Sequence, residues 1–351
     1  MKINLKKEFF TNSEFLLIDH NGMKATTFRY STGVEAIKIE NSRGYFIILP
    51  YQGQQVWRVH FDGHDLQMKT GMAEPVPNTT YLRTYGGFLL HCGVCGIGSP
   101  QAGDKHPQHG ELPNVEYHEA YIDCGENYMA VGGTYRYDES FIRNYTFRPE
   151  CKLYQDDTVL KIHVELENRR TKPMEYMYLC HINFHPIDGA ELVYSAPYDS
   201  EHIKVLTSPD DDAALAEYKA KAAADPSIQN IVGAEGQVYD PEICFTITYK
   251  GDEQNRAYTL QDTGDGAYYV SHPVDALPTG VRWISRTGNE DSMGMILPAT
   301  GEALGYTYGK ENGQVKLLDA MSTLVFDVEA GYITADKACE VREKINAIMN
   351  R

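Results

Sequence analysis

The chain has no stretch of 18 or more apolar residues, the length that a membrane-spanning helix needs, and no basic N-terminus followed by an apolar segment. The sequence therefore predicts neither a membrane span nor a signal peptide, and we expect a cytoplasmic protein. Basic residues are also scarce, because 32 Lys and Arg stand against 49 Asp and Glu, a formal charge of -17. Such a charge repels nucleic-acid phosphates and anionic lipids, so a neutral small molecule is the expected partner.

Cysteine is too sparse and too scattered to form a disulfide framework. The seven cysteines are an odd number spread through 351 residues, which is typical of reduced thiols. Cys92 and Cys95 form a C-x-x-C motif after His91, but no second ligand pair follows at the spacing of a zinc site. The glycines around them instead indicate a tight, buried turn.

Helical periodicity is missing from most of the chain. It occurs only near residues 210–224, where acidic residues lead and Asp225-Pro226 ends the pattern, and near 335–350, with Thr334 as a possible N-cap. Elsewhere short apolar runs are separated by turns such as Asn21-Gly22 and Asp62-Gly63. The sequence therefore predicts an all-β protein, a large antiparallel sandwich, and with no linker or repeat a single domain over residues 1–351.

Residues 71–118 interrupt this strand pattern with many glycines and prolines, which predicts an irregular and functional loop. Arg83 can donate a planar fork of hydrogen bonds to a sugar or carboxylate. Four histidines, His91, His106, His109 and His118, lie within the same segment. No pair has helical i, i+4 spacing and no context fixes a ligand geometry, so we predict no metal site.

A later stretch, residues 176–186, has the alternation of a strand. Leu179, His181, Asn183 and His185 fall on one face, because side chains alternate with period two. The opposite face is apolar and consists of Tyr178, Cys180, Ile182 and Phe184. The polar row is a plausible catalytic wall, since histidine exchanges protons near neutral pH, although hydrogen-bonded structural histidines are as common an explanation.

The order of these motifs resembles a known family. A glycine-rich loop with Arg83 near its start, then His109-Gly110, then the strand with His181-Ile182-Asn183-Phe184, is similar to the galactose mutarotase-like superfamily of aldose 1-epimerases. The nearest branch is one described only as a domain of unknown function. The resemblance covers nearly the whole chain and implies one antiparallel β-supersandwich with a carbohydrate cleft.

The resemblance also implies a cofactor-free reaction at the anomeric carbon of a small carbohydrate. His181 would be the general acid toward the ring oxygen, while Arg83 and His109 would hold the sugar with Asn183, His185 and Tyr85. The family's base is a late glutamate before a proline, but this chain has Leu297 before Pro298. Leucine cannot accept a proton, so Glu302 is the expected base, and Glu290 and Asp291 are further alternatives.

Three functions remain open from the sequence. The first is a carbohydrate epimerase with His181 and Glu302 as catalytic groups, and the second is a sugar-binding protein or sensor that lost its base. The third is a related isomerase or lyase that uses the histidine cluster, with or without a metal. Tyr81, Tyr85 and Tyr178 are the expected aromatic cleft residues. An exposed sandwich face could also support a homodimer.

Overall fold

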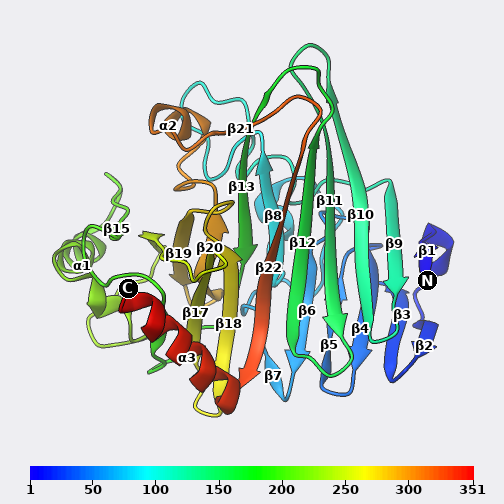
Figure 1. The fold of residues 1–351 in the computed structure, drawn as a ribbon, viewed down its shortest axis with the longest axis horizontal. Helices are drawn as coiled ribbons and strands as arrows, with labels where there is room; N and C mark the ends of the chain where they lie inside the picture. The colour runs from blue at the N-terminus through cyan, green and yellow to red at the C-terminus, as the bar shows by residue number, and fades with distance from the viewer.

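Two large antiparallel sheets stack face to face in the computed structural model, which describes residues 1–351 (Figure 1). Alternation along the strands creates the core between them. In β12 (Val159–Asn168), Leu160, Ile162 and Val164 point into the sandwich, whereas Lys161 and His163 point outward. The main core contains 63 buried residues from both sheets. The predicted all-β sandwich is confirmed.

The first sheet has nine strands, and Figure 1 shows its longest members in front. In spatial order these are β1 (Lys2–Asn4), β9 (Glu119–Cys124), β10 (Tyr128–Glu139), β11 (Arg143–Tyr154), β12, β22 (Thr323–Thr334), β18 (Gly266–Pro273), β17 (Arg256–Asp262) and β14 (Leu192–Tyr194). The outward side chains of its central strands form a charged surface, which includes Arg148, Lys161 and Glu329.

The second sheet has thirteen strands and carries the candidate site. In spatial order its main path is β15 (Ile203–Val205), β16 (Ile243–Thr248), β19 (Thr279–Arg286), β20 (Asp291–Ala299), β13 (Met174–Ile182), β8 (Leu89–Val94), β6 (Val56–Phe61), β5 (Gly44–Ile48), β4 (Glu35–Asn41), β3 (Met23–Arg29) and β2 (Phe15–His20). Two short strands, β21 (Lys316–Leu318) and β7 (His64–Asp65), pair with β13 and β6.

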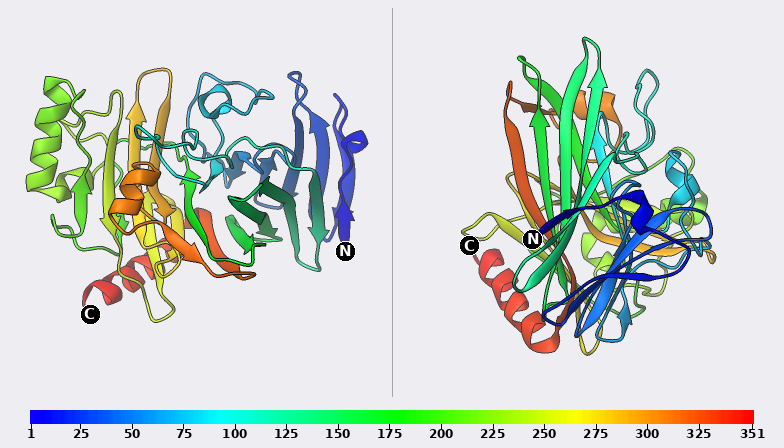
Figure 2. Two further views of the ribbon diagram at one scale, coloured as in Figure 1. Left: turned by 90° about the horizontal axis from the view of Figure 1, so that it is seen from above. Right: turned by 90° about the vertical axis from the view of Figure 1, so that its right-hand side faces the viewer.

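Three α-helices lie outside the two sheets (Figures 1 and 2). They are α1 (Ala213–Ala224), α2 (Tyr306–Glu311) and α3 (Ala335–Met349), and there are 3-10 turns at Lys7–Phe9, Tyr81–Thr84 and Pro226–Gln229. The two predicted helices correspond to α1 and α3. The side chains of Val341, Ile345 and Ile348 bury α3 against the outer face of the first sheet. No helix in the chain is long and apolar enough to span a bilayer.

One expectation about the segment 71–118 is wrong, since it is not irregular throughout. It contains β8, which lies between β13 and β6 in the second sheet. Every residue of β8 is buried, because one face meets the core and loops cover the other. A strand buried on both faces lacks the polar and apolar alternation by which strands are recognised in a sequence.

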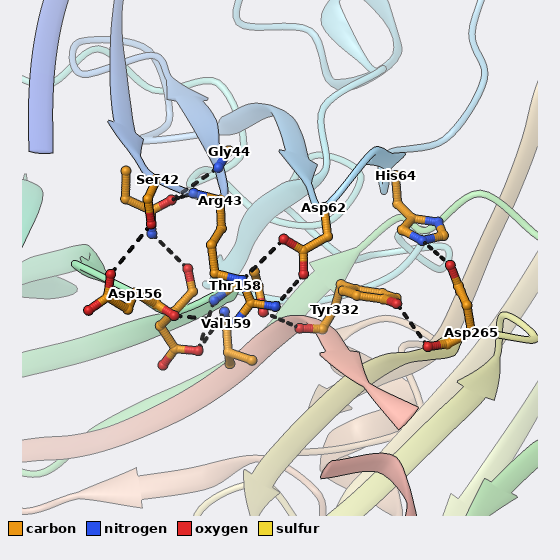
Figure 3. A network of polar contacts seen from close by, with 12 residues as sticks. Ser42, Arg43, Gly44, Asp62, His64, Asp156, Thr158, Val159, Asp265 and Tyr332 are labelled. Atoms are coloured by element: carbon orange, nitrogen blue, oxygen red, sulfur yellow. Dashed lines mark hydrogen bonds and ion pairs between the residues drawn. The ribbon is translucent and has the colours of Figure 1, made fainter. Parts of the chain in front are cut away.

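The turns at one end of the two sheets are joined by a polar network (Figure 3). Arg43, between β4 and β5, donates from Nε to Asp62 Oδ1 at 3.1 Å and from Nη1 to the Asp156 carbonyl at 3.3 Å. Thr158 Oγ1 then donates to the carbonyl of Tyr332 in β22 at 2.6 Å. Because Arg43 and Asp62 belong to the second sheet and the other residues to the first, the network fixes the sheets relative to each other.

Candidate functional site

A cleft of about 450 Å³ opens on the face of the second sheet that points away from the core. Strands β13, β19 and β20 form its floor, and the loops before His109 and after Ala299 form its walls together with the segment around α1. The chemically active side chains that line it are Tyr81, Tyr85, His109, His181, Lys219, Glu242, Trp283 and Glu302. The cleft is large enough for a monosaccharide.

His181 lies at the centre of the cleft floor, near the end of β13. Its predicted strand direction is confirmed, because Tyr178, Cys180 and Ile182 enter the main core on the other face. The side chain is 3% exposed, and its Nδ1 is enclosed with no hydrogen-bond partner in the chain. Nε2 is therefore the nitrogen that a ligand can reach. Burial lowers the pKa of His181 to about 4, although the neighbouring Asn183 side chain opposes the shift.

His109 lies on a loop, and its ring packs beside that of His181. The two ring centroids are 5.3 Å apart in an edge-on arrangement. The backbone of His109 adopts a positive φ of 59° and is fixed by hydrogen bonds to Gly93 and Gly98, both 2.9 Å long. Burial, followed by the charges of His181 and His106, lowers the pKa of His109 well below its usual value. Both imidazoles are therefore uncharged at neutral pH in the free protein.

Aromatic rings surround His181 on its remaining sides. The centroids of Trp283, Tyr85 and Tyr81 lie 5.5, 5.7 and 6.4 Å from that of the imidazole. Tyr85 is held in place because its hydroxyl donates to Asn183 Oδ1 at 3.1 Å, while Asn183 Nδ2 donates to the Gly87 carbonyl at 3.0 Å. Ring faces of this kind pack against the C–H faces of a sugar.

The predicted binding residues do not all reach the cleft. Arg83 lies on the 3-10 turn Tyr81–Thr84 with an exposed side chain, outside the cleft lining. His185 follows the end of β13, and its carbonyl accepts from Gln261 Nε2 at 3.3 Å. Asn183 is fully buried beneath Tyr85, so it positions that ring instead of facing the cavity. The strand ends at Ile182, and this is why the predicted polar row does not continue as one wall.

Tyr178 was expected in the cleft and this expectation is wrong. Its ring belongs to the main core on the opposite face of β13, with 2% exposure. The hydroxyl makes a 2.7 Å hydrogen bond with Nδ1 of His91, which is equally buried. Strand alternation requires this placement, since Tyr178 and His181 are an odd number of residues apart.

Glu302 lines the cleft on a loop that is joined to the His109 loop. Gly98 and Leu304 form a β-bridge, and Gly305 N donates to the Ile97 carbonyl at 3.0 Å. Gly98 has a φ of +76°, and a Cβ there would lie 1.6 Å from the Ala303 carbonyl oxygen, so only glycine permits this approach. The two loops therefore form one wall.

The carboxylate of Asp104 locks this wall from behind, and its side chain is fully buried. Its Oδ1 accepts from Thr307 N at 3.0 Å and from Thr307 Oγ1 at 2.5 Å, and its Oδ2 accepts from Gln101 N at 2.9 Å and Tyr306 N at 3.0 Å. Burial alone would raise the pKa of Asp104, but these hydrogen bonds lower it to about 2. The group is therefore ionised at neutral pH.

Comparison with known families now identifies the chain. A family model described as a domain of unknown function, DUF4432, matches residues 31–331. This chain belongs to the DUF4432 family. No curated protein matches the sequence.

Solved structures show that this DUF4432 protein has the galactose mutarotase-like fold. A Klebsiella pneumoniae protein named as a candidate aldose 1-epimerase superposes with a TM-score of 0.80 at 17% identity, over 99% of this chain and 91% of that one. A galactose mutarotase-like protein from Clostridium acetobutylicum gives 0.61 at 13% identity, over 89% and 98% of the two chains. One from Lactobacillus casei gives 0.54 at 15%, over 85% and 100%.

Three charged or aromatic residues of the DUF4432 cleft were not predicted from the sequence: Lys219, Glu242 and Trp283. Lys219 comes from α1 and pairs at 2.7 Å with Asp211, and both side chains are less than 10% exposed. Trp283 is one of only two tryptophans in the chain, and this rarity could have marked it as a candidate aromatic residue of the cleft. The other two residues follow no motif, because the fold brings them from separate segments.

The four histidines of the segment 71–118 do not converge. Only His109 lines the cleft, whereas His91 contacts Tyr178, His106 contacts Asp104, and His118 lies on the charged surface of the first sheet. Nowhere in the chain do three or more His, Cys, Asp or Glu side chains gather in a way that could hold a metal ion. An isomerase that uses a histidine cluster would need several imidazoles at one point, and here only His109 and His181 come together.

Proposed function

We propose that this protein is a sugar mutarotase that interconverts the anomers of a neutral monosaccharide by acid and base catalysis. The observation that carries the proposal is the reachable Nε2 of His181 at the centre of an aromatic, sugar-sized cleft. The mutarotase-like fold supports it as well. Ring opening needs a proton donor for the ring oxygen and an acceptor for the C1 hydroxyl proton, and we assign the donor role to His181.

The test of this proposal is the rate at which a freshly dissolved pure anomer approaches its equilibrium rotation. Polarimetry on a panel of neutral aldoses should show acceleration in proportion to protein concentration for at least one sugar. Rotation curves that match the buffer background for the whole panel would contradict the proposal.

Non-catalytic sugar binding is the second candidate, and Leu297 is the observation that favours it. Ala299 of β20 pairs directly with Leu179 of β13, so Leu297 lies level with His181 on the neighbouring strand. The residue beside the imidazole is thus apolar, as expected of a cleft that has lost its base. Tight sugar binding without any acceleration in polarimetry would establish this alternative.

The charges of the cleft predict a preference for neutral sugars over sugar phosphates. The one cationic side chain in the lining, Lys219, is already paired with Asp211, while Glu242 and Glu302 add negative charge. A phosphate would meet repulsion without a free cation. We expect a neutral aldose to be turned over with a kcat/KM at least about tenfold higher than its 6-phosphate. Comparable values would show that a cation reaches the substrate.

The low pKa of His181 predicts how the rate depends on pH. A general acid must carry its proton, and at pH values above its pKa the protonated fraction falls tenfold for each unit. Because the pKa of His181 is about 4, kcat/KM should rise as pH falls from 8 to 5, by about tenfold per unit. Polarimetry with buffer catalysis subtracted measures this slope. A flat profile would contradict the role of His181 as the acid.

A further inference from the structure

Mutarotation needs a base, and the position level with His181 is occupied by Leu297. Only two carboxylates line the cleft, Glu302 on the loop wall and Glu242 just before β16. One of these two carboxylates must accept the C1 hydroxyl proton while His181 donates a proton to the ring oxygen.

Glu302 is held toward α2. Its Oε2 accepts a 2.5 Å hydrogen bond from the hydroxyl of Tyr308, a residue of α2 that does not line the cleft. Its backbone N donates to Gln314 Oε1 at 2.9 Å. Both contacts fix the residue as part of the loop wall. The charge of Glu302 acts on Tyr308, where it contributes to a raised pKa of about 12.

Glu242 is held toward the rings around His181. It precedes β16, in which Cys244 pairs directly with Trp283 of β19, and it lies two residues from Cys244 on the same face of the sheet. The indole Nε1 of Trp283 donates to Glu242 Oε2 at 2.6 Å. The same indole ring is 5.5 Å from the His181 ring. Oε1 has no hydrogen-bond partner in the chain in either Glu242 or Glu302, so the two carboxylates differ in the group that holds Oε2: the indole of Trp283 for Glu242 and the hydroxyl of Tyr308 for Glu302.

The charge of Glu242 also acts on two tyrosines that line the cleft. Burial raises the pKa values of Tyr81 and Tyr85 well above 10, and the negative charge of Glu242 raises both further. Glu242, Tyr81 and Tyr85 line the same cleft, and both tyrosine rings flank His181.

We propose that Glu242 is the general base of this site and that Trp283 is its positioning residue. The assignment rests on the proposed mutarotase function. In ring opening the O1–H bond breaks and its proton passes to Glu242 Oε1, while the bonding electrons form the C1=O1 double bond. The C1–O5 bond breaks with its electrons on O5, which takes a proton from His181 Nε2. After rotation about C1–C2, closure reverses both transfers and restores the two side chains.

The assignment is tested by comparing Glu242→Gln with Glu302→Gln on a sugar that the wild type turns over. We expect Glu242→Gln to lower kcat by roughly 100-fold with KM within about threefold, whereas Glu302→Gln, which alters the loop wall, should act mainly on KM. Trp283→Phe, which removes the hydrogen bond but keeps a ring, should lower kcat by about tenfold. Glu242 is exposed, so circular dichroism and thermal unfolding of its variants should match the wild type.

Chemical rescue separates a lost base from a structural effect. Formate should restore part of the activity of Glu242→Ala, because it supplies a carboxylate where the side chain was removed, and should not alter Glu302→Ala. Exchange that survives Glu242→Gln, or that is lost in Glu302→Gln, overturns the assignment of Glu242 alone. A wild type that accelerates no sugar overturns the proposed function and the assignment with it.

Discussion

Replacing His181 with alanine should lower the rate of anomer interconversion by on the order of 10³-fold, the range that a positioned acid contributes. The expectation follows from geometry, because Nε2 of His181 is the reachable imidazole nitrogen at the centre of the cleft floor. Fold and sugar affinity should change little, since the aromatic rings and their supports remain. Polarimetry measures kcat, and sugar titration by calorimetry measures affinity.

His185→Ala is the matched control for this experiment. His185 follows the same strand but does not line the cleft, so its variant should keep kcat within about threefold of the wild type. If His181→Ala retained full activity, the imidazole would be a structural residue and the acid would lie elsewhere. An equal loss in the two variants would point to disruption of β13 instead of lost chemistry.

Replacing Asp104 with alanine should lower the free energy of unfolding by roughly 2 kcal/mol, because four donors behind the cleft wall, three of them partly buried, lose their acceptor. The wall that carries His109 and Glu302 should loosen as well, so KM should rise. Asp104→Asn should recover only part of the stability, since an amide offers one acceptor where the carboxylate offers two. Urea unfolding measures the difference.

The sign of the pH dependence provides a second test of Asp104. Its pKa is about 2 in the folded protein, below the usual value of 3.8. Its stabilising contribution is therefore complete above pH 4 and is lost as pH falls toward 2. The difference in stability between the wild type and Asp104→Asn should shrink over that interval. Asp19→Ala, at an exposed strand position, should stay within about 0.5 kcal/mol of the wild type.

Local pattern was enough to predict much of the fold. The helices α1 and α3 were recognisable from their starts, stops and apolar spacing, and β13 from the alternation of Tyr178, Cys180 and Ile182 with His181. The strand β8 was not, because it is buried on both faces and lies in a segment rich in glycine and proline. Polar and apolar residues alternate along a strand only when one of its faces is buried and the other is exposed. A central strand that loops also cover is buried on both faces and shows no such alternation.

The candidate site was only partly predictable for a different reason. His109, His181, Tyr81, Tyr85 and Glu302 were named from the sequence and line one cleft. Arg83 was named and lies outside it, because the 3-10 turn that buries Tyr81 turns the arginine to solvent. Glu242 enters through the pairing of Cys244 with Trp283 between β16 and β19. Such pairing is a long-range property of the sheet, which no local motif encodes.

The measurement that tests the central claim most directly is saturation-transfer NMR of a neutral sugar at anomeric equilibrium with the wild-type protein. Saturating the anomeric proton of one anomer should reduce the signal of the other in proportion to protein concentration, because each turnover opens and closes the ring. His181→Ala should remove the transfer. Broadening of the sugar signals without any transfer would contradict the account and leave a protein that binds sugars without interconverting them.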